Sequence, residues 1–158
     1  MNRSAIMRAV PSRDTSAEMK ARAILRPIAR GYRLHREDIP GKPDIAFVGR
    51  RLAIFVHGCF WHGHDCRRGA RAPKTNADYW RAKIARNDAR DEKHRVALGD
   101  MGWRSLVIWE CELADEAALA ARLRAFMASP ETPLSRAGSL SRARSPKVPP
   151  AARSAPPR

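Results

Sequence analysis

The chain of 158 residues is long enough for one domain with a core of its own. Its 31 Lys and Arg outnumber its 16 Asp and Glu, and the net charge of +15 favours a polyanionic partner such as nucleic acid over the simpler alternative of incidental basicity. No apolar run approaches the ~20 residues of a membrane span, and residues 1–14 lack the apolar stretch of a secretory signal, so we expect a cytoplasmic protein with no membrane partner.

The first half of the chain predicts a helix followed by a strand and a hairpin. A Thr-Ser-Ala-Glu capping box opens a helix over residues 15–25, which Pro27 ends or kinks. Residues 32–36 predict a short strand. Residues 44–48 and 52–56 are β-branched and apolar and are joined by Gly-Arg, which predicts a β-hairpin.

The second half predicts a helix, a strand and a helix. Residues 76–98 form a long, highly charged helix, residues 103–109 a strand of buried type, and residues 115–127 an amphipathic helix. The sparse inward positions of the long helix are Trp80, Ile84, Asn87 or Asp88, and Asp91, and those of the last helix are Leu119, Leu123 and Phe126. This order of elements predicts a small α/β fold with a central mixed sheet flanked by helices.

The composition changes at Ser129. Residues 129–158 hold seven prolines, six serines and six Arg or Lys against a single acid, which predicts a disordered basic tail. Without it, residues 1–128 keep a net charge of +10, so the basicity belongs mainly to the folded domain.

The loop after the hairpin concentrates metal-binding residues. Cys59, His64 and Cys66 are spaced as C-x4-H-x-C, and Cys111 follows the strand at 103–109. A Cys3His set is typical of a closed, structural zinc site. The alternative is three buried free cysteines and a surface histidine, since this spacing is less diagnostic than paired C-x-x-C motifs.

Two histidines of the same loop, His57 and His62, fall outside this ligand set. Histidines at a strand end can carry protons near neutral pH when an acid lies close by. Asp44, at the start of the hairpin, is the candidate acid, although the sequence leaves the register open and a Pro-Asp pair is more often a turn.

Together these residues resemble the very-short-patch repair (Vsr) DNA mismatch endonuclease family. The resemblance covers residues 2–127 and lies in the Gly-Lys-Pro-Asp44 segment, the segment FVHGCFWHGHDC at 55–66, and Trp109-Glu-Cys111. It implies a restriction-endonuclease-like fold and a Mg2+-dependent nick on the 5′ side of the thymine in a T:G mismatch, which arises when 5-methylcytosine deaminates. It also implies a bacterial, nucleoid-associated monomer bound to double-stranded DNA, with mismatch-repair proteins as candidate partners.

The resemblance further assigns roles to individual residues. Asp44 and the backbone carbonyl of Val56 would hold Mg2+, with His62 as water activator oriented by Asp91. His57 would contact the scissile phosphate or its hydrated metal, and Glu18 would lie at the edge of the site. The implied zinc ligands are Cys59, His64, Cys66 and Cys111, and the implied DNA-binding residues are Phe60, Trp61, Trp80 and Met7.

Two departures bear on the chemistry. Val56 stands where well-known members of the family have threonine, so a hydroxyl contact is absent while the carbonyl is kept. The segment at 55–57 also occupies the place where restriction-type nucleases carry E-x-K, so histidines must supply the proton chemistry.

Several alternatives stay open. Phe60, Trp61 and Trp80 could pack in the core, and Asp91 could be a solvated helix residue, because its neighbours Arg90, Glu92 and Lys93 look exposed. For the whole protein, the alternatives are a non-catalytic, zinc-stabilised DNA-binding adaptor and a nuclease of the same fold that acts on another nucleic acid. The adaptor would have no use for Asp44 together with the two free histidines, which favours the enzyme.

Overall fold

The computed structural model describes residues 13–129, in which three α-helices and four strands form a small α/β fold with a mixed sheet, as predicted. Met7 and residues 130–158 of the predicted tail lie outside the described residues. Within this part of the chain, no helix has the length and apolar character needed to cross a membrane.

The sheet has the order β1-β2-β3-β4. Its strands are β1 (Arg33–Leu34), β2 (Ile45–Phe47), β3 (Leu52–His57) and β4 (Arg104–Trp109). The first three strands are antiparallel neighbours, whereas β3 and β4 are parallel and are joined by the long helix. The predicted hairpin is therefore present, and the strand expected at 32–36 is shortened to two residues.

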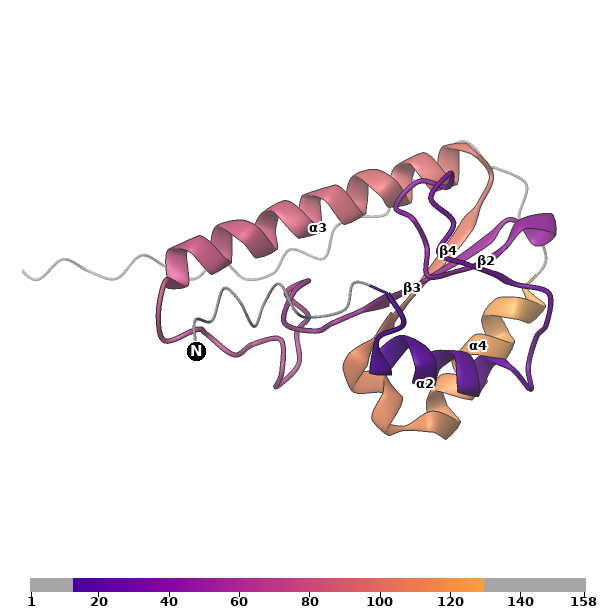
Figure 1. Ribbon diagram of the computed structural model, residues 1–158, viewed down its shortest axis with the longest axis horizontal. Coiled ribbons are helices and arrows are strands. Elements are labelled where there is room, and N and C mark those ends of the chain that lie inside the picture. Colours follow the sequence, from indigo (N-terminus) through magenta and orange to yellow (C-terminus); the bar gives the residue numbers. More distant parts are fainter. Residues whose placement is uncertain (1–12, 130–158) are drawn as a thin grey trace, which may run out of the picture.

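Both faces of the sheet are covered, because successive side chains of a strand point to opposite faces. Helices α2 (Ser16–Leu25) and α4 (Glu116–Ala128) lie together on one face (Figure 1), where they bury Ile45, Leu52 and Ile54. This is the larger core of the domain.

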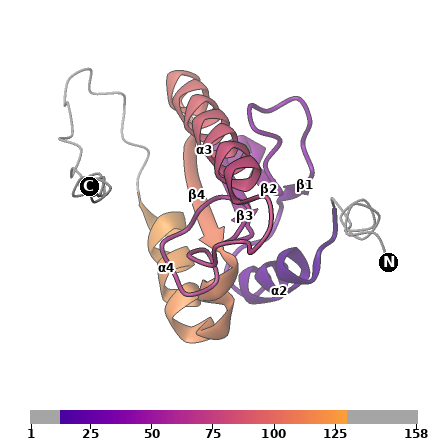
Figure 2. The same ribbon diagram turned by 90° about the vertical axis from the view of Figure 1, so that its left-hand side faces the viewer.

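Helix α3 (Ala77–Asp100) covers the other face only near its C-terminal end. There Leu98 packs on Ala46 and Ala53, which pair directly across β2 and β3 and leave room for the helix because they are small. Leu98 is the one fully buried residue of the 24 in α3. The N-terminal half of the helix extends beyond the sheet, beside the segment that links β3 to α3 (Figures 1 and 2). A long polar helix face is thus available to line a site.

Two local structures precede β2 in the chain. Thr15 caps α2 by accepting a hydrogen bond from the Glu18 N–H, as the capping box predicts. A turn at Pro40-Gly41 closes with a hydrogen bond from the Lys42 N–H to the Ile39 carbonyl. Gly41 is required in this turn, because its φ is +80° and a Cβ atom would lie 3.0 Å from Phe55 and 3.1 Å from His94.

Candidate active site

A cleft of about 940 Å3 opens between α3, the 37–42 loop and the ends of the sheet strands. Its walls include Asp44, His57, His62 and Asp91, which the sequence singles out from three separate stretches of the chain. The cleft is therefore the place where these side chains meet.

Asp44 lies immediately before β2 and faces the end of β3. Its Oδ2 accepts a hydrogen bond of 2.7 Å from the Val56 N–H, which answers the question of register left open by the sequence. Burial raises the pKa of Asp44 to about 6, and the nearby charge of Glu18 acts in the same direction, while the Val56 N–H opposes the shift. The ionised form of Asp44 is thus disfavoured, and a nearby cation would favour it.

His57, His62 and Asp91 form a second cluster in the cleft. The two imidazoles stack with centroids 3.8 Å apart and planes at 8°, and His62 Nδ1 lies 2.5 Å from Asp91 Oδ2. Burial, followed by the charge of His62, lowers the pKa of His57 to about 4. His57 is therefore neutral at physiological pH, and Asp91 of α3 holds His62 through one ring nitrogen.

Four side chains converge on the outer side of the same loop. The potential ligand atoms of Cys59, His64, Cys66 and Cys111 all lie within 4.8 Å of one another. Two of the sulfurs also accept backbone N–H groups: Gly69 donates to Cys66 Sγ at 3.3 Å, and Cys111 donates to Cys59 Sγ at 3.4 Å. The Gly69 N–H lowers the pKa of Cys66 to about 6, whereas burial raises the pKa of Cys59 to about 12. The close approach of the four potential ligand atoms means that this cluster could hold a metal ion.

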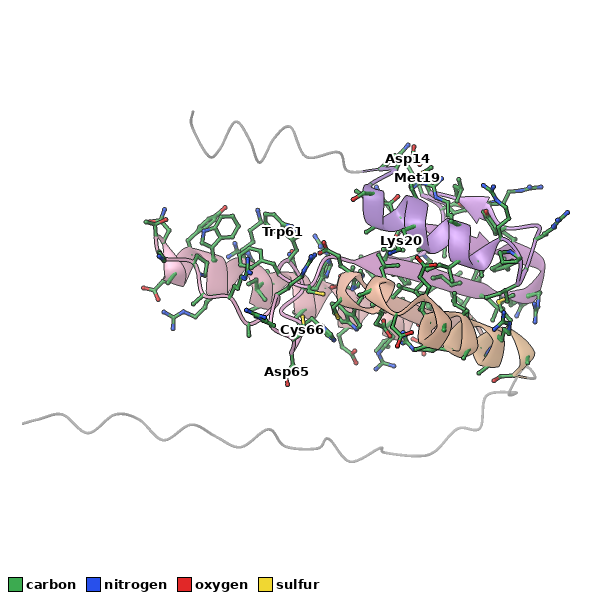
Figure 3. All side chains as sticks on the ribbon, turned by 90° about the horizontal axis from the view of Figure 1, so that it is seen from below. Asp14, Met19, Lys20, Trp61, Asp65 and Cys66 are labelled. Carbon is green, nitrogen blue, oxygen red and sulfur yellow. The ribbon has the colours of Figure 1, made fainter. Side chains whose placement is uncertain are left out.

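Phe60, Trp61 and Trp80 form an aromatic cluster apart from both hydrophobic cores. Their ring centroids are 5.3–5.8 Å apart, and the rings meet edge to face or tilted. Asn87 of α3 donates a 2.9 Å hydrogen bond to the Trp61 carbonyl and so holds the loop. Trp61 lies on the opposite side of the loop from Asp65, which points away from the protein (Figure 3). The aromatic rings are half-buried and accessible to a ligand.

Comparison with known proteins identifies a family and several relatives of this chain. Residues 1–68 match the family model described as DNA mismatch endonuclease Vsr. The chain is 53% identical over 119 residues to a type II nicking enzyme, V.XorIIP, of Xanthomonas oryzae, covering 75% of this chain and 87% of the relative. It is 39% identical over 111 residues to the DNA mismatch endonuclease Vsr of Escherichia coli, covering 70% of each chain.

The chain belongs to the Vsr family of DNA mismatch endonucleases. Membership of this family makes the protein an enzyme that cleaves DNA. The cleft contains side chains suited to phosphodiester hydrolysis. A non-catalytic adaptor is therefore not the function of this Vsr domain.

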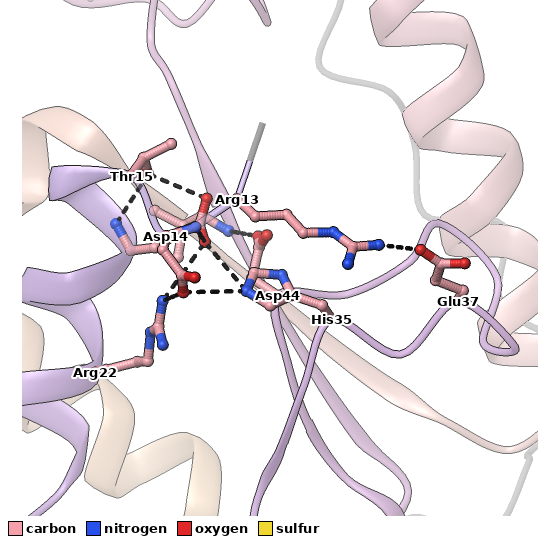
Figure 4. Close-up of polar contacts among 9 residues, drawn as sticks. Arg13, Asp14, Thr15, Arg22, His35, Glu37 and Asp44 are labelled. Carbon is pink, nitrogen blue, oxygen red and sulfur yellow. Dashed lines mark hydrogen bonds and ion pairs between the residues drawn. The ribbon is translucent and has the colours of Figure 1, made fainter. Parts of the chain in front are cut away.

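Glu18 is buried, with an exposed fraction of 5%. Its carboxylate accepts hydrogen bonds from the Asp14 N–H and the Thr15 hydroxyl, both at 3.0 Å. Figure 4 shows Asp14, Thr15 and His35 near Asp44, and His35 Nε2 lies 3.7 Å from Glu18 Oε2. The capping box thus brings Glu18 near Asp44, at the cleft.

Two further residues, His35 and Arg90, lie close to the site and were not expected there from the sequence. His35 donates its backbone N–H to the Asp44 carbonyl at 3.2 Å, and nothing in the local sequence indicates this contact. Arg90 is exposed, as expected from the sequence, but it lines the cleft. Its position next to Asp91 and three residues after Asn87 was the available signal.

The raised pKa of Asp44 predicts that Asp44→Asn stabilises the protein when no divalent cation is added. Below about pH 4 the carboxyl is neutral in both the folded and the unfolded chain. Between about pH 4 and 6 it ionises only when unfolded, so the folded state loses stability as pH rises, by roughly 3 kcal/mol in all. Urea unfolding at pH 8 should therefore show Asp44→Asn more stable than wild type by about 1–3 kcal/mol, with little difference at pH 4.

Asp78→Asn is the matched control, because the Asp78 side chain is 96% exposed on α3. It should leave the free energy of unfolding within about 0.5 kcal/mol of wild type at both pH values. An Asp44→Asn protein that is less stable than wild type at pH 8 would show that the carboxylate has a structural role instead.

Proposed function

We propose that this protein nicks one DNA strand immediately 5′ to the thymine of a T:G mismatch and so starts very short patch repair of deaminated 5-methylcytosine. The observation that carries this proposal is the meeting of Asp44 with the His57–His62–Asp91 cluster in one cleft, where His62 comes from the loop that also bears Phe60 and Trp61. Family membership supports the substrate class.

In this proposal Asp44 and the backbone carbonyl of Val56 hold a catalytic Mg2+. A carboxylate and a carbonyl are hard oxygen ligands of the kind that Mg2+ prefers. The ion would offset negative charge on the phosphate oxygens during cleavage. The hydrogen bond from the Val56 N–H keeps the Asp44 carboxylate beside the Val56 backbone, which fits this ligand pair.

The histidines carry the proton chemistry. His62 accepts a proton from the attacking water, and Asp91 orients the ring and stabilises the imidazolium that forms. His57, neutral because of its lowered pKa, donates a hydrogen bond to the scissile phosphate or to its hydrated metal. Glu18 lies behind Asp44 and orders the polar groups at the edge of the site.

The loop has a second, structural function in this proposal. Cys59, His64, Cys66 and Cys111 bind one Zn2+ in a closed Cys3His site, which leaves no open position for substrate. The bound ion would keep the loop in place while His62 and Trp61 face the substrate.

The aromatic cluster reads the mismatch. Phe60, Trp61 and Trp80 enter the DNA stack at the mispaired step, which is easier to open than a matched one. Met7, outside the described residues, would approach from the opposite groove.

We further propose a restriction-endonuclease-like fold and a boundary at residue 128. The Vsr domain would span residues 1–128, and the basic tail of residues 129–158 would add phosphate contacts without taking part in the chemistry. The domain would act as a monomer, with mismatch-repair proteins as candidate partners.

The direct test is Mg2+-dependent nicking of two duplexes that differ only in carrying T:G or C:G at one position. A nick 5′ to the thymine in the T:G duplex alone supports the proposal. Equal cleavage of both duplexes, or cleavage of RNA instead, would favour the same-fold nuclease with another substrate.

Asp44→Asn and His62→Ala should abolish this nicking. The first change weakens the cation site and the second removes the base, whereas neither side chain belongs to the aromatic cluster that binds the mismatch. Gel-shift assays should therefore show T:G binding near the wild-type level. A variant that keeps nicking within a few-fold of wild type would remove the role assigned to its residue.

Cys111→Ser should lose zinc and folded protein together, because a structural zinc ion contributes directly to folding. Elemental analysis should give about one Zn2+ per wild-type chain. Asp65→Ser is the control, since Asp65 lies in the same loop but is exposed and outside the cluster. A folded, active preparation without zinc would contradict the assignment.

Trp61→Ala should narrow the preference for T:G over matched DNA. The change removes stacking of roughly 1–3 kcal/mol, by analogy with base–aromatic contacts, while contacts with phosphates remain. Nicking of both duplexes should be compared for Phe60→Ala, Trp61→Ala and Trp80→Ala. Unchanged discrimination in all three variants would mean that the mismatch is read elsewhere.

A further inference from the structure

The cleft has few cations that can attract a phosphate, although two of its acids, Glu37 and Asp38, pair with Arg13 and Arg36. Its walls include six acids, Glu37, Asp38, Asp44, Asp88, Asp91 and Glu92, and three cations, Lys42, Arg90 and Arg95. Arg95 is already paired with Glu92, with hydrogen bonds of 2.8 Å and 2.5 Å. Only Lys42 and Arg90 are therefore available, among the described residues lining the cleft, to attract a phosphate.

Arg90 directly precedes Asp91, the partner of His62, on α3. Like His57 and His62, Arg90 lines the cleft. Within residues 13–129 it forms no salt bridge, and its one side-chain hydrogen bond is a 3.3 Å contact with Asn87 Oδ1. Most of its N–H donors are thus free for a ligand.

Strand β3 does not supply a fixed positive charge of its own. Its sequence, LAIFVH, contains no Lys or Arg, so the strand has no side chain that is permanently charged. Charge that builds up on phosphate oxygens must then be offset by a bound cation or by a side chain from another element. Arg90 of α3 meets this requirement, because a guanidinium stays protonated and offers several donors in one plane.

We propose that Arg90 binds the phosphate at the cleavage site and stabilises the charge that develops on its non-bridging oxygens. This assignment rests on the proposed function, because it assumes that the phosphate lies between Asp44 and the His57–His62 pair. It makes Arg90 a catalytic residue in addition to those proposed above, with a phosphodiester oxygen as its ligand.

Asn87 connects this guanidinium to the aromatic cluster. Its side-chain oxygen accepts from Arg90, and its nitrogen donates to the Trp61 carbonyl. The same amide therefore orients the phosphate-binding group and the mismatch-reading loop. A purely structural role for Arg90 would act through this amide, so the test must separate the two roles.

The test uses the full-length protein and three variants. Arg90→Met removes the charge, and Arg90→Lys keeps a charge but not the planar set of donors. Arg95→Met is the matched control, because Arg95 lies on the same helix and lines the same cleft but already has a carboxylate partner. Thermal unfolding shows whether each protein is folded.

Single-turnover nicking with enzyme in excess should be about 100-fold slower for Arg90→Met, the effect of removing one charge-stabilising donor. The rate should fall by the same factor for T:G and matched duplexes, if the matched duplex is nicked measurably. Arg90→Lys should recover part of the rate, and Arg95→Met should stay within about three-fold of wild type. A rate for Arg90→Met within a few-fold of wild type would overturn the assignment, as would a loss confined to T:G discrimination.

A binding measurement tests the contact between Arg90 and the phosphate independently of catalysis. Without a catalytic cation, the slope of log K against log salt for duplex binding should fall by about 1 in Arg90→Met and should not change in Arg95→Met. If wild type fails to nick T:G DNA, the proposed function fails, and this slope still tests the phosphate contact. An unchanged slope in Arg90→Met would rule that contact out.

Discussion

The arrangement of the site depends on two hydrogen bonds from α3 to the loop that follows β3. Asn87 holds the Trp61 carbonyl, and Asp91, one helical turn later, holds the His62 ring. Because both contacts come from the same helix, they fix the position of the aromatic cluster relative to the imidazole pair. Because α3 has little apolar surface to bury, it can present a polar face to the cleft over most of its length.

The cleft contains two groups whose pKa values are shifted in opposite directions. Burial raises the pKa of Asp44 and lowers that of His57, so in both cases the charged form is disfavoured. A protein that only needed stability would replace such groups with apolar ones. Their retention in a shared cleft is typical of sites where a cation or a substrate supplies the missing charge.

The N-terminal part of the described chain supports the same site from the other side. The capping box of α2 buries Glu18 beneath Asp44, and His35 links the Asp14 side chain to the backbone of Asp44. One local helix-start motif therefore serves both folding and the placement of charge.

The elements of the fold could be predicted from the sequence because each depends on local patterning. The capping box, the two apolar runs joined by Gly-Arg and the helical spacing from Trp80 to Asp91 all act over a few residues, and α2, the hairpin and α3 appear where these patterns place them. β1 is shorter than predicted because a strand's length depends on its partner, and β2 offers only a two-residue register with it.

For the site, the sequence by itself determined the Cys3His set and the residues shared with the Vsr family, since their spacing is a property of the chain. It could not choose between Asn87 and Asp88 as the inward residue of α3, nor show that Asp44 meets the Val56 N–H. Nor could it show that Arg90 lines the cleft beside His57. The tertiary structure decided these points, because they depend on how β3, its loop and α3 pack together, and side chains far apart in the sequence interact only after that packing is fixed.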